Sequence, residues 1–314
     1  QSVLLQNDDK FSIFSINIQS LNAKFDKLVS FLHGLHEDNF DFSAICIQET
    51  WLSQEDDISM FELPGYHLIS QGKLCCGHGG LIVYLQDKFT YKLRKMYDTS
   101  EIWEGLFIDI EGGNMENKIT LANIYRPPKR NNCNSTIEAF IQEFKPIVHA
   151  LGQENSTALF AGDFNIDLSK IDERQKFQEY FDLFVTLGFY PKLTLPTRFS
   201  RRNCTLIDQI FCRFARSTQM STSGIFFSNM SDHLPYFIYF DMNTIKKSVP
   251  KTVKVNTYDA NSINAFCENV RSVITQNPLN VNLLADPNPN YNFLEKTLQE
   301  SREKYLPSKF VKFN

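Results

Sequence analysis

Seven polar side chains with the chemistry to act on a phosphate group follow apolar segments of the chain. They stand at or just beyond the ends of predicted strands: Asn17, Glu49, Asp163, Asn165, Asp208, Asp232 and His233. A carboxylate inside an apolar strand would carry a large desolvation cost, whereas one at a strand end can reach a solvent-filled cleft. If the sheets bring these ends together, they form an acidic pocket with one histidine and two amides. Such a pocket suits a hard cation such as Mg²⁺, which prefers oxygen ligands and keeps several waters.

Asp163 and Asn165 could place a base beside an amide donor. In an extended segment, residues two apart point to the same face. Asp163 could then take a proton from water while Asn165 holds that water or a phosphate oxygen. Each residue alone has a plainer interpretation, because Asp and Asn are common in turns and helix caps. The segments Gly162–Asn165 and Ser231–His233 therefore matter as members of the ordered set rather than singly.

Short strands separated by a few helices must position these side chains. Apolar runs and alternating patterns predict strands, and apolar residues at helical spacing predict helices. The predicted strands cover residues 11–16, 42–47, 81–85, 102–110, 119–125, 158–161, 206–211 and 236–240, with a hairpin turn at 112–114. Helices are predicted around 25–32, from a capping box of Ser135 and Glu138 to about Leu151, and over 177–187.

A change in composition near Asn243 predicts two domains, 1–242 and 243–314. The first holds all the strand-end polar side chains. The second is rich in Lys and Asn and shows helical patterns at 261–274 and 293–305. Because the chain stops shortly after the last pattern, we interpret the second part as a helical linker toward further sequence.

The composition is that of a globular protein without membrane spans. Hydrophobic residues make up 42% and aromatic residues 13%, enough for a sizeable core. The net charge of −4 excludes a uniformly basic nucleic-acid wrapper but is compatible with a local basic patch. Seven cysteines are scattered without metal-ligand spacing, and no apolar run approaches membrane-spanning length. We therefore expect an intracellular protein with reduced thiols and no membrane partner.

The ordered set of motifs resembles the endonuclease/exonuclease/phosphatase superfamily. The similar segments, in order, are Ser15–Leu21, Ile47–Leu52, Ile124–Pro128, Ala161–Asn165, Thr205–Ile210 and Ser231–Pro235, and the resemblance covers about residues 11–241. The local sequences IYRPP, GDFNID, TLIDQIF and SDHLP resemble the apurinic-endonuclease-like domain of non-LTR, LINE-type retrotransposon polyproteins. The resemblance implies a DNase-I-like α/β fold, a four-layer sandwich of two packed, mainly antiparallel sheets flanked by helices.

The resemblance also implies a metal site. Glu49 would be the principal ligand of Mg²⁺, with Mn²⁺ as a substitute, and Asn17 and Asp232 would lie nearby. A metal and a cationic imidazole together could neutralise a phosphate as it gains charge in the transition state.

Five further residues receive catalytic roles from the same resemblance. Asp163 would activate or position the attacking water, and Asn165 and Tyr125 would contact the phosphate. His233 would stabilise charge on the phosphate oxygens and would be oriented by Asp208. No position of the core motif set is lost, which argues against an inactive copy.

Basic residues beside the expected pocket predict contacts with double-stranded DNA. The candidates are Arg126, Lys129, Arg130, Arg198, Arg201 and Arg202. Arginines with an interleaved aromatic suit phosphate contact and minor-groove probing, although a solvated loop is the plainer interpretation of 197–203. The resemblance implies a DNA-contacting hairpin here and aligns Thr197 with a threonine near the DNA. Trp51 either packs against DNA or closes the core.

Three hypotheses follow. The first is a metal-dependent endonuclease that nicks DNA and leaves a 3′-hydroxyl for target-primed reverse transcription. Its reverse transcriptase and its RNA partner would involve sequence beyond Asn314, and it would act in the nucleus after synthesis in the cytoplasm. The second is an abasic-site repair nuclease, or a phosphatase of the same superfamily acting on inositol phosphates or lipids. The third is a catalytically silent binding module. The arginine-bearing segment and the C-terminal extension favour the first hypothesis.

Overall fold

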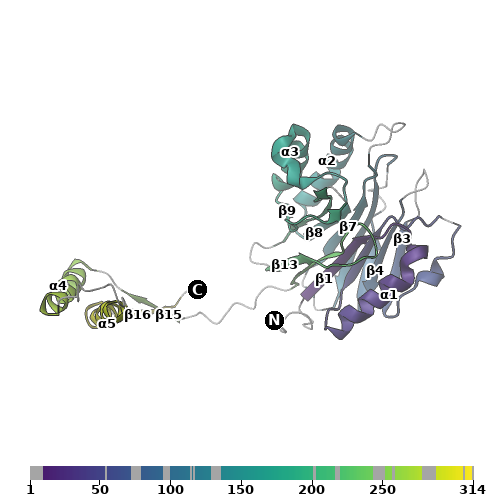
Figure 1. Ribbon diagram of the computed structural model, residues 1–314. Coiled ribbons are helices and arrows are strands. Elements are labelled where there is room, and N and C mark those ends of the chain that lie inside the picture. The colour runs from purple at the N-terminus through teal and green to yellow at the C-terminus, as the bar shows by residue number, and fades with distance from the viewer. Residues whose placement is uncertain are drawn as a thin grey trace. The chain divides into compact units, whose positions relative to one another are not determined.

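The chain forms two compact units, residues 1–245 and 246–314, in the computed structural model (Figure 1). The structure describes residues 10–53, 55–71, 79–94, 100–113, 115, 117–128, 136–200, 203–215, 220–242, 252–256, 259–277, 288–306 and 308–312.

Two six-stranded sheets form the centre of the described part of the first unit. The first has the order β13 (Ser221–Ile225), β14 (Tyr236–Asp241), β1 (Lys10–Asn17), β2 (Ala44–Gln48), β4 (Leu81–Gln86) and β3 (Tyr66–Gln71). The second has the order β5 (Phe89–Leu93), β6 (Glu104–Gly112), β7 (Ile119–Tyr125), β8 (Thr157–Asp163), β12 (Asp208–Arg213) and β9 (Tyr190–Pro191). Only β1–β2 and β7–β8 are parallel among these described pairs, so the predicted, mainly antiparallel arrangement is confirmed.

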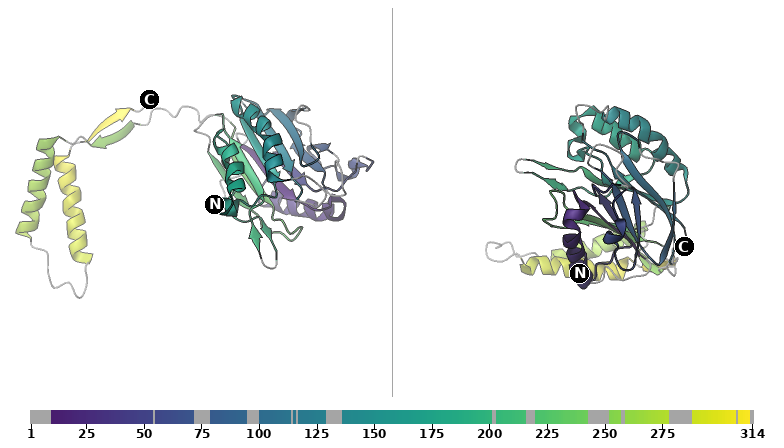
Figure 2. Two further views of the ribbon diagram at one scale, coloured as in Figure 1. Left: turned by 90° about the horizontal axis from the view of Figure 1, so that it is seen from above. Right: turned by 90° about the vertical axis from the view of Figure 1, so that its right-hand side faces the viewer.

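Helices cover the outer face of each sheet and complete the four layers (Figures 1 and 2). Helix α1 (Leu21–Glu37) buries one apolar stripe against the first sheet. Helices α2 (Ile137–Gln153) and α3 (Gln175–Val185) pack on the second sheet through buried phenylalanines. Apolar positions repeat every three to four residues in these helices, so each presents one apolar face to its sheet. The predicted sandwich is therefore confirmed.

Helix α2 begins one residue later than the predicted capping box suggests. The Thr136 hydroxyl accepts a hydrogen bond from the Ala139 N–H at 3.2 Å and acts as the N-cap. The predicted cap, Ser135, lies outside the described residues. Two short 3₁₀ segments, Ile58–Phe61 and Leu168–Glu173, complete the helical elements described in this unit.

Strands at or near the sheet edges were not predicted. Strands β3, β5 and β13 are missing from the sequence-based assignment, and each has several half-exposed or exposed positions. An edge strand pairs on one side only and needs little apolar sequence, so its pattern is weak. The unpredicted strands extend the sheets but contribute none of the polar side chains discussed above.

Gly162 allows β7 and β8 to approach closely just before the candidate base. A Cβ atom at this position would lie 1.9 Å from the carbonyl oxygen of Ile124, and the φ angle is +147°. Both features exclude a side chain here. The glycine of the Gly-Asp-Phe-Asn motif therefore has a structural role in placing Asp163 at the strand end.

An ion-pair network joins the strand end at Arg94 to the end of α2. The Arg94 guanidinium donates to both carboxylate oxygens of Glu154, at 2.6 and 2.7 Å, and to Asp109 at 2.7 Å. Chiefly through the hydrogen bonds from Arg94, the pKa of Glu154 falls from 4.5 to about 2. A carboxylate with a lowered pKa stabilises the fold at pH values above its unfolded-state pKa of about 4.5. This stabilisation is lost as the pH falls from about 4.5 through about 2.

Glu154→Gln is expected to lower the free energy of unfolding by about 1–3 kcal/mol at neutral pH, the usual range for hydrogen bonds to charged groups. The free energy of unfolding of this variant should also decrease less between pH 4.5 and pH 2 than that of the wild type. Urea unfolding at several pH values measures both effects. Glu173→Gln, at an exposed position, is the control, and equal unfolding curves for the two variants would contradict the prediction.

The second unit combines two helices with a two-stranded ribbon. Helices α4 (Ala260–Gln276) and α5 (Asn288–Tyr305) lie near the predicted positions, and the Ser301 hydroxyl donates to Asn269 Oδ1 at 2.9 Å between them. The ribbon pairs β15 (Thr252–Asn256) with β16 (Ser308–Lys312) and was not predicted, because its strands are distant in sequence. Within the described residues, neither unit contains a helix with the length and apolarity needed to cross a membrane.

Candidate active site

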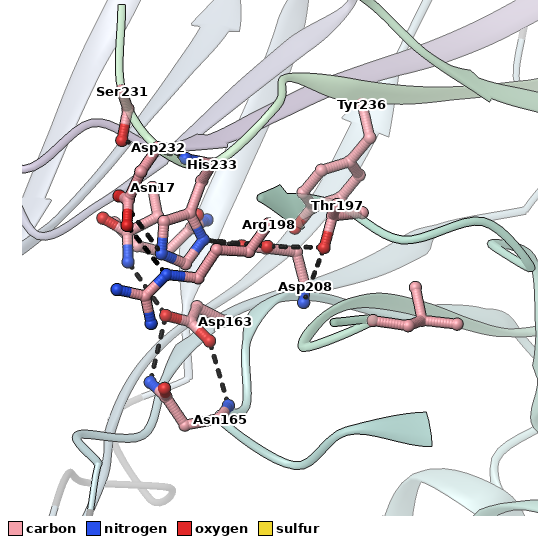
Figure 3. A network of polar contacts seen from close by, with 12 residues as sticks. Asn17, Asp163, Asn165, Thr197, Arg198, Asp208, Ser231, Asp232, His233 and Tyr236 are labelled. Carbon is pink, nitrogen blue, oxygen red and sulfur yellow. Dashed lines mark hydrogen bonds and ion pairs between the residues drawn. The ribbon is translucent and has the colours of Figure 1, made fainter. Parts of the chain in front are cut away.

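The predicted polar side chains meet at one edge of the sandwich. Figure 3 shows Asn17, Asp163, Asn165, Asp208, Asp232 and His233 in this arrangement, and Glu49 contacts Asn17. Asn17 ends β1 and Glu49 follows β2. These neighbouring strands are parallel, so both residues lie at the carboxyl ends of the strands, on the same side of the sandwich. In the opposite sheet, Asp163 ends β8 and is the register partner of Asp208, the first residue of β12. His233 precedes β14. The topology therefore brings together groups that are far apart in the sequence.

Asn17 links the two sheets. Its Nδ2 atom donates to Glu49 Oε1 at 2.8 Å and to Asp163 Oδ2 at 2.9 Å, and its side chain is fully buried. Its Oδ1 atom is buried without a hydrogen-bond partner in the described part of the chain. A buried acceptor of this kind requires a donor or a cation to offset its desolvation.

Asp163 and Asn165 are side by side, but not for the predicted reason. The segment is not extended, because β8 ends at Asp163 and Asn165 has a left-handed φ of +49°. The resulting turn directs the Asn165 backbone N–H to Asp163 Oδ1 at 2.9 Å and Asn165 Nδ2 to Asp163 Oδ2 at 3.0 Å. Aspartate and asparagine favour such side-chain-to-backbone turns. The side chains are adjacent, but through this turn and not through the extended backbone that the sequence argument considered.

Asp208 and His233 form a buried carboxylate–imidazole pair. His233 Nδ1 lies 2.9 Å from Asp208 Oδ2, and both side chains are almost completely buried. The Thr197 hydroxyl donates to the same Asp208 oxygen at 2.7 Å and accepts the Asp208 backbone N–H at 3.2 Å. Because Nδ1 faces Asp208, the other ring nitrogen, Nε2, is the one on the side of Asp232, at 3.9 Å from Asp232 Oδ1.

The electrostatics give Asp163 and His233 opposite properties. Burial, together with the neighbouring charge of Asp208, raises the pKa of Asp163 to about 7. Burial disfavours the charged imidazole, but the charges of Asp208, Asp163 and Asp232 outweigh it and raise the pKa of His233 to about 9. Near neutral pH the site can therefore contain a carboxylate that accepts a proton and an imidazolium that donates hydrogen bonds.

Tyr125 and Trp51 both interact with Glu49. The Trp51 indole N–H donates to Glu49 Oε2 at 3.1 Å, so this side chain orients the carboxylate. Tyr125 is 1% exposed, and burial followed by the charges of Glu49 and Asp163 raises the pKa of its phenol well above the ordinary value. The phenol therefore stays protonated and can donate a hydrogen bond at neutral pH.

Two separate sets of residues could hold a metal ion. Among the described His, Cys, Asp and Glu residues, only Asp163, Asp208 and His233 offer three candidate ligand atoms within 4.8 Å of one another. In this set, however, His233 Nδ1 already faces Asp208. The predicted set of Glu49, Asn17 and Asp232 supplies hard oxygen atoms, including the buried Asn17 Oδ1. This donor chemistry fits a divalent cation such as Mg²⁺ or Mn²⁺ better.

The structure disagrees with two of the predicted DNA contacts. Arg126 is 2% exposed, and its guanidinium donates to the carbonyl oxygens of Phe164 and Asn165 and lies over the Phe140 ring. It supports the turn below the site instead of facing solvent. Thr197 is fully buried against Asp208, so its side chain orients the carboxylate–imidazole pair.

Arg198 is the exposed basic residue of the predicted group that the structure describes. It belongs to a hairpin of β10 (Arg198–Phe199) and β11 (Cys204–Thr205). Its Nε atom donates to Asp232 Oδ2 at 2.8 Å, and the Phe199 N–H donates to the Asp232 carbonyl oxygen at 3.2 Å. The predicted hairpin is thus attached to the loop that holds His233. Lys129, Arg130, Arg201 and Arg202 lie outside the described residues.

Sequence reasoning missed two charged residues near the site. Lys24 on α1 donates to the Ile18 carbonyl oxygen at 2.7 Å and lies close enough to Asp232 and Glu49 to feel their charges. Glu104 is a buried carboxylate at the start of β6. The sequence pattern placed Glu104 inside a strand predicted over 102–110, and only the structure shows that the strand begins at this residue.

Comparisons with known proteins agree with this arrangement. A model of the endonuclease/exonuclease/phosphatase family matches residues 14–233. The endonuclease domain of TRAS1, a telomere-specific non-LTR retrotransposon, is similar with a TM-score of 0.56 and 15% identity, covering 74% of this chain and 99% of that one. The Neisseria 3′ phosphatase NExo, bound to a product DNA hairpin, has a TM-score of 0.54, 18% identity and the same coverage. An AP endonuclease from Archaeoglobus fulgidus has a TM-score of 0.54 and 17% identity, covering 73% of this chain and 98% of that one.

At these identities the structural likeness shows a shared fold. The family match spans most of the first unit and contains the candidate site residues from Asn17 to His233. The chain belongs to the endonuclease/exonuclease/phosphatase family of hydrolytic nucleases and phosphodiesterases.

Proposed function

We propose that this chain is a divalent-metal-dependent endonuclease that nicks double-stranded DNA and leaves a 3′-hydroxyl end. The observation that carries the proposal is that the buried side chains of Asp163 and His233 lie together at one edge of the sandwich, with polar atoms within 4.8 Å of each other. Asp163 is placed to act as a base and His233 as a cationic donor. Phosphodiester hydrolysis needs both a proton acceptor for the attacking water and positive charge beside the phosphate.

The residues of the site divide this work between them. Asp163 takes a proton from the attacking water, and Asn165 holds the carboxylate through two hydrogen bonds. His233 uses its Nε2–H to stabilise a phosphate oxygen, because Nδ1 is bound to Asp208. The protonated phenol of Tyr125 donates a further hydrogen bond to the phosphate. Thr197 keeps the Asp208 carboxylate in place.

Glu49, Asn17 and Asp232 are the residues that would hold a divalent cation. When bound, the cation supplies positive charge that offsets the charge gained by the phosphate in the transition state. Arg198 is paired with Asp232 in the structure. The Asp232 carboxylate is therefore both the ion-pair partner of Arg198 and a proposed metal ligand. Contact with a DNA phosphate would draw the Arg198 guanidinium away from Asp232.

The hairpin favours DNA over a small phosphorylated molecule as the substrate. It carries exposed Phe199 next to Arg198, and backbone hydrogen bonds join it to the His233 loop at Asp232 and Leu234. A cation and an aromatic side chain on a short ribbon suit backbone contact and groove probing. Similarity to the TRAS1 endonuclease domain supports placement in a non-LTR retrotransposon polyprotein. Nuclear action, target-primed reverse transcription and an RNA partner are part of this proposal.

A second candidate is cleavage at a damaged or blocked DNA end. The similarity to a DNA-bound 3′ phosphatase and to an AP endonuclease, at nearly equal TM-scores, favours it as the alternative. Both activities could use the same base and imidazolium, so the distinction lies in how the DNA is held.

Relaxation of supercoiled plasmid, with and without EDTA, tests the proposal. We expect conversion to the nicked form with Mg²⁺ or Mn²⁺, loss of activity with EDTA, and nick ends that a polymerase extends directly. Parallel assays use an abasic duplex, a 3′-phosphorylated duplex and a phosphoinositide. If one of these substrates is turned over rapidly while supercoiled plasmid is not nicked, the chain would be assigned to the corresponding alternative.

A further inference from the structure

Glu104 is a buried carboxylate that the proposed chemistry does not use. It is 7% exposed and begins β6 in the second sheet. Its Oε2 atom accepts the backbone N–H of Gly80 at 2.6 Å, and Gly80 immediately precedes β4 in the first sheet. A single side chain therefore connects the two sheets close to the catalytic edge.

Gly79 and Gly80 in turn hold the loop that contains Glu49. The Trp51 N–H donates to the Gly79 carbonyl oxygen at 2.8 Å, and the Thr50 N–H donates to the Gly80 carbonyl oxygen at 3.1 Å. These two donors directly follow Glu49 in the chain. The position of the Glu49 carboxylate thus depends on where the glycine pair lies.

The Glu49 loop has a backbone that needs such support. Glu49 and Trp51 have left-handed φ angles of +52° and +59°, and neither is glycine. This conformation is strained for a residue other than glycine and persists where surrounding contacts enforce it. The hydrogen bonds from Thr50 and Trp51 to the glycine pair are contacts of this kind.

A side chain at Gly79 would meet the Glu104 carboxylate. A Cβ atom on Gly79 would lie 2.2 Å from Glu104 Oε1, and Gly79 has a φ of +135°. Glu104 is also the register partner of Tyr125, the proposed phosphate contact. Glu104 therefore has one neighbour that supports the Glu49 loop, Gly80, and one neighbour at the proposed phosphate site, Tyr125.

We propose that Glu104 is a positioning residue that fixes the Glu49 metal-ligand loop through its hydrogen bond to Gly80. This inference rests on the proposed role of Glu49 in metal binding. It predicts that Glu104 governs metal affinity without being a ligand, in the way that hydrogen bonds to ligands usually do.

The test is Mn²⁺ binding to the full chain, measured from the electron paramagnetic resonance signal of free Mn²⁺. Glu104→Ala is expected to weaken binding about tenfold or more, the usual effect of losing a partner that orients a ligand. Glu104→Gln should retain most of the affinity, because its amide oxygen can still accept the Gly80 N–H. Glu104→Asp keeps the charge but is one methylene shorter, so it should behave like Glu104→Ala. Glu111→Ala, an exposed position on the same strand, is the matched control.

A double-mutant cycle with Gly79 tests the contact itself. Gly79→Ala alone drives a methyl group into the Glu104 carboxylate. In a Glu104→Ala background that clash is absent, so the losses of Mn²⁺ affinity should be clearly less than additive. Additive losses would show that the two positions act independently and would count against the proposal.

The variant Glu49→Ala separates failure of this inference from failure of the proposed function. If Glu49→Ala binds Mn²⁺ as tightly as the wild type, the proposed metal site itself is wrong. If Glu49→Ala loses binding while both Glu104→Ala and Glu104→Asp keep it, Glu104 does not position the loop. Circular dichroism and thermal unfolding confirm that each variant is folded. If Glu104→Ala does not fold, the comparison of Glu104→Asp with Glu104→Gln decides.

Discussion

Asp163→Asn is expected to lower the rate of plasmid nicking by on the order of 10²- to 10⁴-fold, the usual contribution of a general base. Asparagine is nearly the same size but cannot take a proton from water. Asp163 also accepts hydrogen bonds from Asn17 and Asn165, and an amide at 163 replaces one acceptor with a donor. Initial rates of plasmid relaxation at saturating Mn²⁺ measure the loss, and DNA affinity should change little.

The pH dependence of the wild type provides an internal check on this role. A base with a pKa raised to about 7 is protonated below that value, so activity should fall as the pH decreases through about 7. Asp163→Asn should lack this limb in its residual activity. Asp172→Asn, an exposed carboxylate after the same strand, is the control and should leave the profile unchanged. Wild-type activity that stays constant from pH 8 down to about pH 5 would contradict the assignment of Asp163.

His233→Ala is expected to reduce the nicking rate by on the order of 10²- to 10³-fold, the effect of removing one preorganised donor to a developing anion. The imidazolium is buried, so water cannot readily replace its charge. Single-turnover nicking with excess enzyme measures the chemical step apart from product release. His149→Ala, an exposed histidine on α2, serves as the control.

Asp208 sets the charge of His233, which gives a second readout of the same role. With a pKa of about 9, His233 loses its proton as the pH rises, so activity should fall through that pH. Asp208→Asn removes the main charge that raises this pKa, and the basic limb should move to lower pH. An unchanged rate in His233→Ala, or a basic limb that stays in place in Asp208→Asn, would show that His233 does not stabilise the phosphate.

The sequence alone identified the groups to which we assign the proposed chemistry. Asn17, Glu49, Asp163 and Asp208 were recognisable because each polar side chain interrupts or ends an apolar run, and a strand end is where such a group avoids desolvation. Local patterns also located the central strands and the helices, because burial on one face makes apolar residues repeat at the spacing of a strand or of a helix. These features are encoded in neighbouring residues, which explains why they could be read without coordinates.

Only the tertiary structure decided which way several side chains face. Arg126 and Arg198 were both predicted DNA contacts, yet the first is buried beneath the Asn165 turn and the second is partly exposed and paired with Asp232. Thr197 stands in a polar segment but is buried against Asp208. Orientation of this kind depends on the packing of segments distant in sequence. The link from Glu104 to Gly80 has the same origin, because the packing of the two sheets brings the carboxylate of β6 to the backbone N–H of Gly80, whose carbonyl oxygen accepts a hydrogen bond from the loop that holds Glu49.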